Sequence, residues 1–91
     1  MASLKEERLE SYLIGGQERF YRLAYSYLRD REEALDAVQT AVCRCLERRD
    51  SLRDEAALGT WFTRILVNAC MDLLRQRKRV TFVSPEDLNT G

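Results

Sequence analysis

Polar side chains recur at steps of three or four residues near the end of the chain. At this spacing they lie along one side of a helix: Arg64, Asn68, Asp72, Arg75 and Arg79. Guanidinium groups bind phosphates, and a side-chain amide offers both a hydrogen-bond donor and an acceptor. The spacing therefore predicts one helix side with the groups needed to contact phosphates and bases.

The charges are distributed unevenly although the 91-residue chain has a formal net charge of zero. Residues 48–79 carry eight Lys or Arg against four Asp or Glu, whereas residues 1–47 carry seven against nine. A basic half is typical of polyanion binding. The alternative is that the basic run RQRKR, residues 75–79, is a solvated helix end whose charge suits the helix dipole. Its position, on the same helix as the polar line and after a loop containing Arg48, Arg49 and Arg53, favours single-stranded nucleic acid as the ligand.

Several function classes are disfavoured by the composition. There is no His, and three Cys cannot complete a four-ligand zinc site from this chain alone, so Cys43, Cys45 and Cys70 are expected to be buried free thiols. No nucleophile elbow, glycine-rich phosphate loop or HExxH motif is present, so we expect no catalytic residue, no metal, no cofactor and no enzyme activity. The longest uncharged run, Ala56 to Thr63, is too short to insert into a membrane, and the charged N-terminus lacks a secretory signal. We therefore expect a cytoplasmic protein.

The elements that position the polar line are predicted to be helices. Ser3 to Glu6 has the spacing of a capping box, and the helix that starts there should end at Gly15-Gly16 with a left-handed cap. A second helix starts at Gln17, with a buried face of Phe20, Leu23, Ala24, Tyr27 and Leu28. Asp30 caps a third helix, whose apolar stripe is Ala34, Leu35, Val38, Ala41, Val42, Cys45 and Leu46.

A charged loop separates the third helix from the last. Six of the nine residues from Arg48 to Ala56 are charged, which predicts an exposed segment. The last helix should be the longest, from about Leu58 to Arg79, with a buried face of Leu58, Trp61, Phe62, Ile65, Leu66, Ala69, Cys70, Leu73 and Leu74. The fold class predicted is all-α, a compact bundle of about four helices.

Three segments together resemble a known family. FYRLAYSYLRD, EEALDAVQTAVCRCLE and TWFTRILVNACMDLLRQRKR, in this order, resemble conserved region 2 of bacterial RNA polymerase sigma factors of the extracytoplasmic-function (ECF) group. The resemblance covers about Phe20 to Arg79. It implies a helical promoter-recognition domain that binds the clamp of the core polymerase, on the beta-prime subunit, and captures unpaired non-template bases of the minus-ten element.

The resemblance also assigns a polymerase contact to the motif D-A-V-Q, Asp36 to Gln39. These two residues, three apart, lie on one exposed face where they can meet arginines of a partner, although they could also be ordinary surface residues. The predicted clamp-binding set is Asp36, Gln39, Thr40 and Arg44. Thr40 stands where many family members have Glu, a departure that bears on polymerase affinity.

The DNA-binding residues follow from the same resemblance. The loop from Arg48 to Glu55 is similar in placement to the family's base-capturing loop, and Asn68 matches the Asn of its R-I-x-x-N pattern, with a bond to water or backbone as the alternative role. Trp61, in the family's T-W motif, is expected to pack in the core first and to stack on a base second. The predicted set is Arg49, Ser51, Arg53, Arg64, Asn68, Arg75, Arg77, Lys78 and Arg79.

The resemblance divides the chain into a region 2 domain, residues 1–79, and the start of an interdomain linker or disordered tail, residues 80–91. It implies a longer factor with a second domain that reads the minus-35 element. It also implies an anti-sigma factor as a further partner. Two alternatives remain from the residues alone: a helical protein-interaction module with an incidental basic helix end, and a small duplex-binding regulator, which the lack of a short helix-turn-helix pair disfavours.

Overall fold

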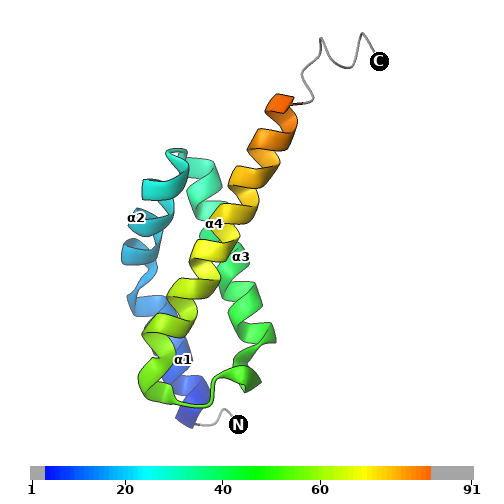
Figure 1. The fold of residues 1–91 in the computed structure, drawn as a ribbon. Coiled ribbons are helices and arrows are strands. Elements are labelled where there is room, and N and C mark those ends of the chain that lie inside the picture. Colours follow the sequence, from blue (N-terminus) through cyan, green and yellow to red (C-terminus); the bar gives the residue numbers. More distant parts are fainter. Residues whose placement is uncertain (1–3, 83–91) are drawn as a thin grey trace.

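A computed structural model describes the backbone of residues 4–82 and the side chains of residues 6–77. All regular elements in this part of the chain are helices, as predicted: α1 (Leu4–Gly15), α2 (Gln17–Leu28), α3 (Arg31–Glu47), the short 3-10 helices η1 (Arg49–Ser51) and η2 (Glu55–Ala57), and α4 (Leu58–Phe82). Helices α2, α3 and α4 pack on one another, and Figure 1 shows α1 beneath the start of α4. The prediction of a four-helix bundle with the longest helix last is confirmed.

The corner between α2 and α3 is only two residues long. Arg29 ends α2 in the left-handed conformation, with φ 54°, and its N–H donates to the carbonyl of Tyr25. Asp30 then caps α3, as predicted, because its Oδ1 accepts the N–H of Glu33 at 2.9 Å. The two caps reverse the chain without a longer loop.

The left-handed cap predicted at Gly15-Gly16 is wrong. Helix α1 ends at Gly15, but neither glycine has a positive φ, and Gly16 has φ −103°. A Cβ added at Gly16 would come within 2.5 Å of the ring of Phe20. Glycine is needed at position 16 because an aromatic ring packs directly on its backbone.

The core is built from aromatic rings at one end and small side chains between the helices. Phe20 and Phe62 are buried with ring centroids 4.4 Å apart, and Tyr12 packs against both. On α3 the fully buried positions hold small residues, Ala34, Ala37, Ala41 and Cys45. Small residues allow helices to approach closely, which explains why α3 can contact both α2 and α4.

Some predicted core positions lie at the surface instead. Leu35 is 53% exposed, Leu46 39% and Tyr27 39%. The predicted stripe on α3 was centred on its larger apolar residues, whereas the actual buried face is rotated toward Ala37. The apolar side chain of Leu35 is therefore exposed and can contribute to a binding surface.

Helix α4 ends at Phe82, three residues beyond the predicted end at Arg79. The β-branched Val80 and Thr81 lower helix propensity only slightly, so they do not stop the helix. Figure 1 shows the last turns of α4 rising past the α2–α3 corner. The Ser3 capping box and residues 83–91 lie outside the described residues. None of the described helices combines the length and apolar character that a membrane span requires.

Candidate nucleic-acid interface and docking surface

The outer side of α4 carries the polar line that the spacing predicted. Arg64, Asn68 and Arg75 are exposed on this helix, with Met71 partly buried beside them. Arg64 and Asn68 also border an open pocket whose other lining residues are Gly59, Thr60, Thr63 and Val67. The pocket offers guanidinium, hydroxyl and amide groups beside an apolar side chain, a mixture suited to a base attached to its phosphate.

Asp72 lies within the same line but its carboxylate is occupied on both oxygens. Arg44 of α3 places Nη2 3.0 Å from Oδ2, and Arg75 places Nη1 2.8 Å from Oδ1. The Arg44 contact joins α3 to α4. Arg44, predicted on the polymerase surface, is therefore directed toward the polar line of α4.

The segment between α3 and α4 is exposed as predicted, but it is not irregular throughout. It contains η1 and η2, and between them Leu52 is only 4% exposed. Asp54 caps η2 by accepting the N–H of Ala56 at 3.0 Å. One apolar anchor and one side-chain cap thus hold the charged loop in a defined shape.

Two ion pairs tie this loop to α1, a contact that sequence spacing could not show. Arg8 pairs with Glu55, and Arg49 Nε lies 3.7 Å from Glu6 Oε1. The partners are more than 40 residues apart in the chain, so no local signal predicts them. Helix α1 serves as the support of the loop.

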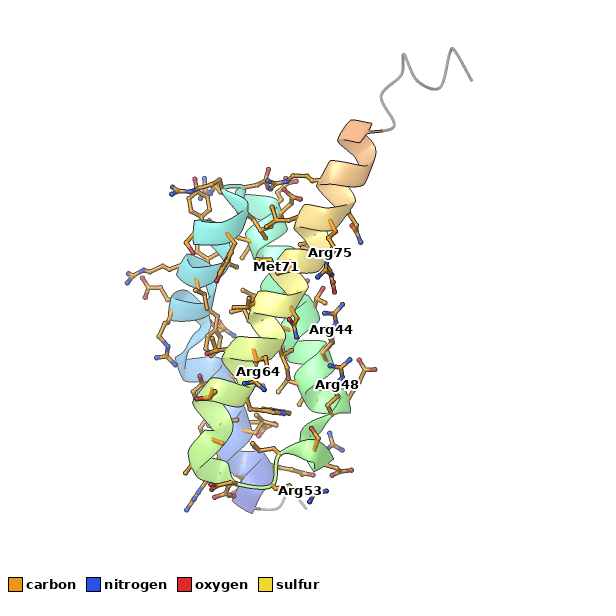
Figure 2. All side chains as sticks on the ribbon, in the orientation of Figure 1. Arg44, Arg48, Arg53, Arg64, Met71 and Arg75 are labelled. Carbon is orange, nitrogen blue, oxygen red and sulfur yellow. The ribbon has the colours of Figure 1, made fainter. Side chains whose placement is uncertain are left out.

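The predicted DNA-binding residues of the loop differ in their surroundings. The Ser51 hydroxyl donates to the carbonyl of Arg48 at 2.7 Å, and Arg49 faces Glu6. Arg48, Arg53 and Arg64 are exposed and have no carboxylate partner among the residues whose side chains are described. Figure 2 shows a basic strip along α3, the loop and α4, made of Arg44, Arg48, Arg53, Arg64 and Arg75.

Arg77, within the basic run, contacts the α2–α3 corner. Its Nε donates to Glu33 Oε1 at 3.0 Å and its Nη2 to the carbonyl of Leu28 at 2.6 Å. The hydrogen bond with Glu33 raises the pKa of Arg77 above its ordinary value. Arg77 thus joins α4 to the α2–α3 corner, and its predicted phosphate contact stays a prediction. The side chains of Lys78 and Arg79 lie outside the described residues.

A second surface lies between α2 and α3. An apolar groove of about 470 Å³ is lined by Gln17, Tyr21, Leu35, Val38, Gln39, Val42 and Cys43. Asp36 joins Leu35 and Gln39 in an adjoining hollow with Glu32 and Glu33. We call these two hollows together the α2–α3 groove. It combines an apolar floor with an acidic rim.

The structure divides the four residues predicted to contact the polymerase. Asp36 and Gln39 border the α2–α3 groove, whereas Arg44 pairs with α4, and Thr40 lies one turn before Arg44 on α3. The apolar floor itself was missed because Leu35 was placed in the core. Its signal was present: small residues at positions 34, 37, 41 and 45 identify the buried face and leave Leu35 outside it.

The cysteines are free, as expected, but not all are buried. Cys45 and Cys70 are buried, and burial raises the pKa of both thiols, that of Cys45 to about 11. Cys43 is exposed in the α2–α3 groove, which corrects the prediction for that residue. The described residues contain no group of three or more His, Cys, Asp or Glu side chains that could hold a metal ion.

Comparison with known proteins places the chain in a family. The sigma-70 region 2 family matches residues 16–80, from the residue after α1 through most of α4. This chain belongs to that family. The resemblance predicted from the three sequence segments is confirmed.

Individual relatives are named as sigma factors. The chain is 35% identical over 69 residues to the RNA polymerase sigma factor SigV of Bacillus subtilis, a match that covers 76% of this chain and 42% of the relative. It is 40% identical over 68 residues to the ECF RNA polymerase sigma factor SigM of Mycobacterium tuberculosis, covering 75% of this chain and 35% of the relative. The chain thus spans about two fifths of the length of these relatives. No solved structure matches the chain significantly.

Proposed function

We propose that this chain is the domain with which an ECF sigma factor docks on the clamp of core RNA polymerase and captures single-stranded non-template DNA of the minus-ten element. The observation that carries the proposal is the presence of two unlike surfaces on one bundle. The basic strip lies along α3, the loop and α4, and Asn68 borders the same pocket as Arg64 of that strip. The α2–α3 groove is lined by other residues of α3 together with Gln17 and Tyr21 of α2. A sigma domain needs both a polymerase surface and a DNA surface.

On the DNA side, the mechanism is capture of bases that have already left the duplex. Opening the duplex costs stacking and pairing energy, and binding of the exposed strand offsets this cost. The Asn68 amide contacts a base edge at the pocket beside Arg64, while the arginines of the strip bind phosphates. A flipped base is held by three residues of the loop, Arg49, Ser51 and Arg53. To bind it, Arg49 gives up its ion pair with Glu6, and Ser51 gives up its hydrogen bond to the carbonyl of Arg48.

On the polymerase side, the α2–α3 groove supplies the contact. Leu35 provides exposed apolar area at the centre, and Asp36 and Gln39 provide a carboxylate and an amide at the rim. Apolar anchors inside a polar rim are the usual arrangement of a protein interface. An anti-sigma factor would inhibit the domain by covering the same groove or the basic strip.

The test is binding of fluorescent non-template single strands by core polymerase together with the 91-residue chain. We expect Asn68→Ala to reduce discrimination among strand sequences by about 1–3 kcal/mol, because an amide contact to a base edge is lost. Lys78→Ala should instead weaken binding of all strands equally and flatten the salt dependence. Arg22→Ala, an exposed residue of α2 paired with Glu18, serves as the control and should change neither.

Core association is measured separately. Asp36→Ala should weaken it without lowering the thermal unfolding midpoint, because Asp36 is exposed. A wild-type chain that bound neither core polymerase nor any strand would refute the proposal. Core association without strand preference would favour the alternative of a protein-interaction module.

A further inference from the structure

Asp72 occupies an unexpected position for an acid. It is the only Asp or Glu in α4, which contains five Lys or Arg, and it lies one turn from Asn68 on the predicted DNA side. Its carboxylate receives one guanidinium from α3 and one from α4, at 3.0 and 2.8 Å. All three side chains reach solvent, with exposed fractions of 31% for Arg44, 40% for Asp72 and 69% for Arg75.

The geometry is that of two arginines converging on one anion. A guanidinium has five N–H donors, so Arg44 and Arg75 each keep donors for a further acceptor while holding Asp72. Two guanidinium groups around one oxyanion is also the arrangement by which proteins bind a phosphate group. Asp72 supplies the negative charge when no phosphate is present, and it keeps both side chains in place.

We propose that Arg44, Asp72 and Arg75 form a self-neutralised phosphate-binding site for the backbone of single-stranded DNA. The inference rests on the proposed function and deepens it. Asp72 orients the two guanidinium groups and lowers the local charge from +2 to +1, so that the domain does not bind every strand tightly. This proposal assigns Arg44 to the DNA-binding surface, whereas the sequence predicted it on the polymerase-binding surface.

The test uses the 91-residue chain and labelled oligo(dT), and it follows anisotropy as the salt concentration rises. Asp72→Asn leaves two guanidinium groups uncompensated and should tighten binding about three- to tenfold at low salt. Arg44→Gln and Arg75→Gln should each weaken binding and reduce the slope of log affinity against log salt by about 0.7, the value for one phosphate contact on a single strand. Since phosphate contacts carry no base information, relative affinities for different strand sequences should not change in any of these variants.

A matched control separates this site from a general charge effect. Glu18 and Arg22 form an exposed ion pair on α2, with Glu18 Oε1 2.8 Å from Arg22 Nη2. Glu18→Gln removes the carboxylate of this pair and so changes the net charge by the same amount as Asp72→Asn. It should alter oligo(dT) affinity much less than Asp72→Asn does. Core association of Arg44→Gln should equal that of the wild type, and thermal unfolding verifies that each variant is folded.

The proposed phosphate site would be refuted if a folded Arg44→Gln variant kept the wild-type affinity for oligo(dT) and the wild-type salt slope. Arg44 would then only connect α3 to α4. It would also be wrong if Asp72→Asn behaved like Glu18→Gln. Either result together with lost discrimination in Asn68→Ala would overturn this site and leave the proposed function intact. A wild-type chain that bound no strand, with or without core polymerase, would overturn both.

Discussion

The two surfaces of this domain share α3 but are built on opposite principles. The α2–α3 groove has an apolar floor, with Leu35 53% exposed, and an acidic rim that includes Asp36. The basic strip is polar and contains several arginines without a carboxylate partner among the described side chains. Apolar area favours a shaped protein partner, whereas charge favours an extended polyanion. A chain of zero net charge can thus present two unlike surfaces by separating its charges in space.

Loss of the hydrophobic core beneath both surfaces should have the largest effect on stability and on binding. Phe62→Ala removes a fully buried ring that packs 4.4 Å from Phe20, and should lower the free energy of unfolding by about 3–5 kcal/mol. Thermal and urea unfolding followed by circular dichroism measure the change. Polymerase and DNA binding should then be lost together.

The control for this prediction is Ile14→Ala. Ile14 is 69% exposed, so the change should cost less than about 0.5 kcal/mol and leave both binding activities unchanged. If Phe62→Ala removed only one of the two activities, the two surfaces would not depend on a common core.

The next effect should separate the two surfaces. Leu35→Glu places a charge at the centre of the α2–α3 groove and should weaken core polymerase association about tenfold or more, while DNA binding and stability stay close to wild type. Leu46→Glu makes the same change at another exposed leucine of α3 that does not line the groove. Equal losses of core association in both variants would contradict a specific role for the groove.

The smallest effect should come from a chemical probe of the groove. Cys43 is exposed, so iodoacetamide should modify it in the native state, whereas the buried Cys45 and Cys70 should react only after unfolding. Burial raises the pKa of Cys45 to about 11, so little thiolate forms at that residue below this pH in the folded protein. Mass spectrometry of native samples between pH 7 and 9 should find one modified thiol.

Alkylated protein should lose part of its core association, about severalfold, but retain DNA binding, because Cys43 lines only the groove. The Cys43→Ala variant should resist this loss. Rapid modification of Cys45 at pH 7 would show instead that the α3 core opens readily.

The raised pKa of the Cys45 thiol also predicts that the free energy of unfolding falls at alkaline pH. The unfolded thiol ionises near its ordinary value of 9.0 and the folded one near 11, so the contribution of Cys45 to stability is complete below pH 9 and is lost as the pH rises through 11. Cys45→Ala should reduce this alkaline loss. The comparison is made by unfolding midpoints from pH 8 to 11.

Much of the architecture follows from local patterns along the chain. Apolar spacing predicted α2, α3 and α4, and a capping-box spacing with Gly15-Gly16 predicted α1. Asp30 with Glu33 predicted the start of α3, because caps and periodicity act within a few residues. The exposed line of Arg64, Asn68 and Arg75 was predicted for the same reason. The family also follows from the sequence, since three segments in fixed order match it.

Long-range contacts could not be predicted in this way. The pairing of Arg49 with Glu6 and of Arg77 with Glu33 joins residues far apart in sequence, and the orientation of Arg44 depends on where α4 crosses α3. The exposure of Leu35 was missed because periodicity alone does not say which of two adjacent helix faces meets a neighbour. The small residues of α3 indicate which face is buried, but only because small side chains favour close packing of helices.

The sequence by itself determined the helices, their order, the family and the side of α4 that carries the polar line. Only the tertiary structure decided that Arg44 and Arg75 meet on Asp72, that α1 supports the loop, and that Leu35 lies in a groove. The physical reason is the range of the interactions. Helix formation depends on residues within about four positions, whereas ion pairs and grooves depend on the angle and rotation at which whole helices pack.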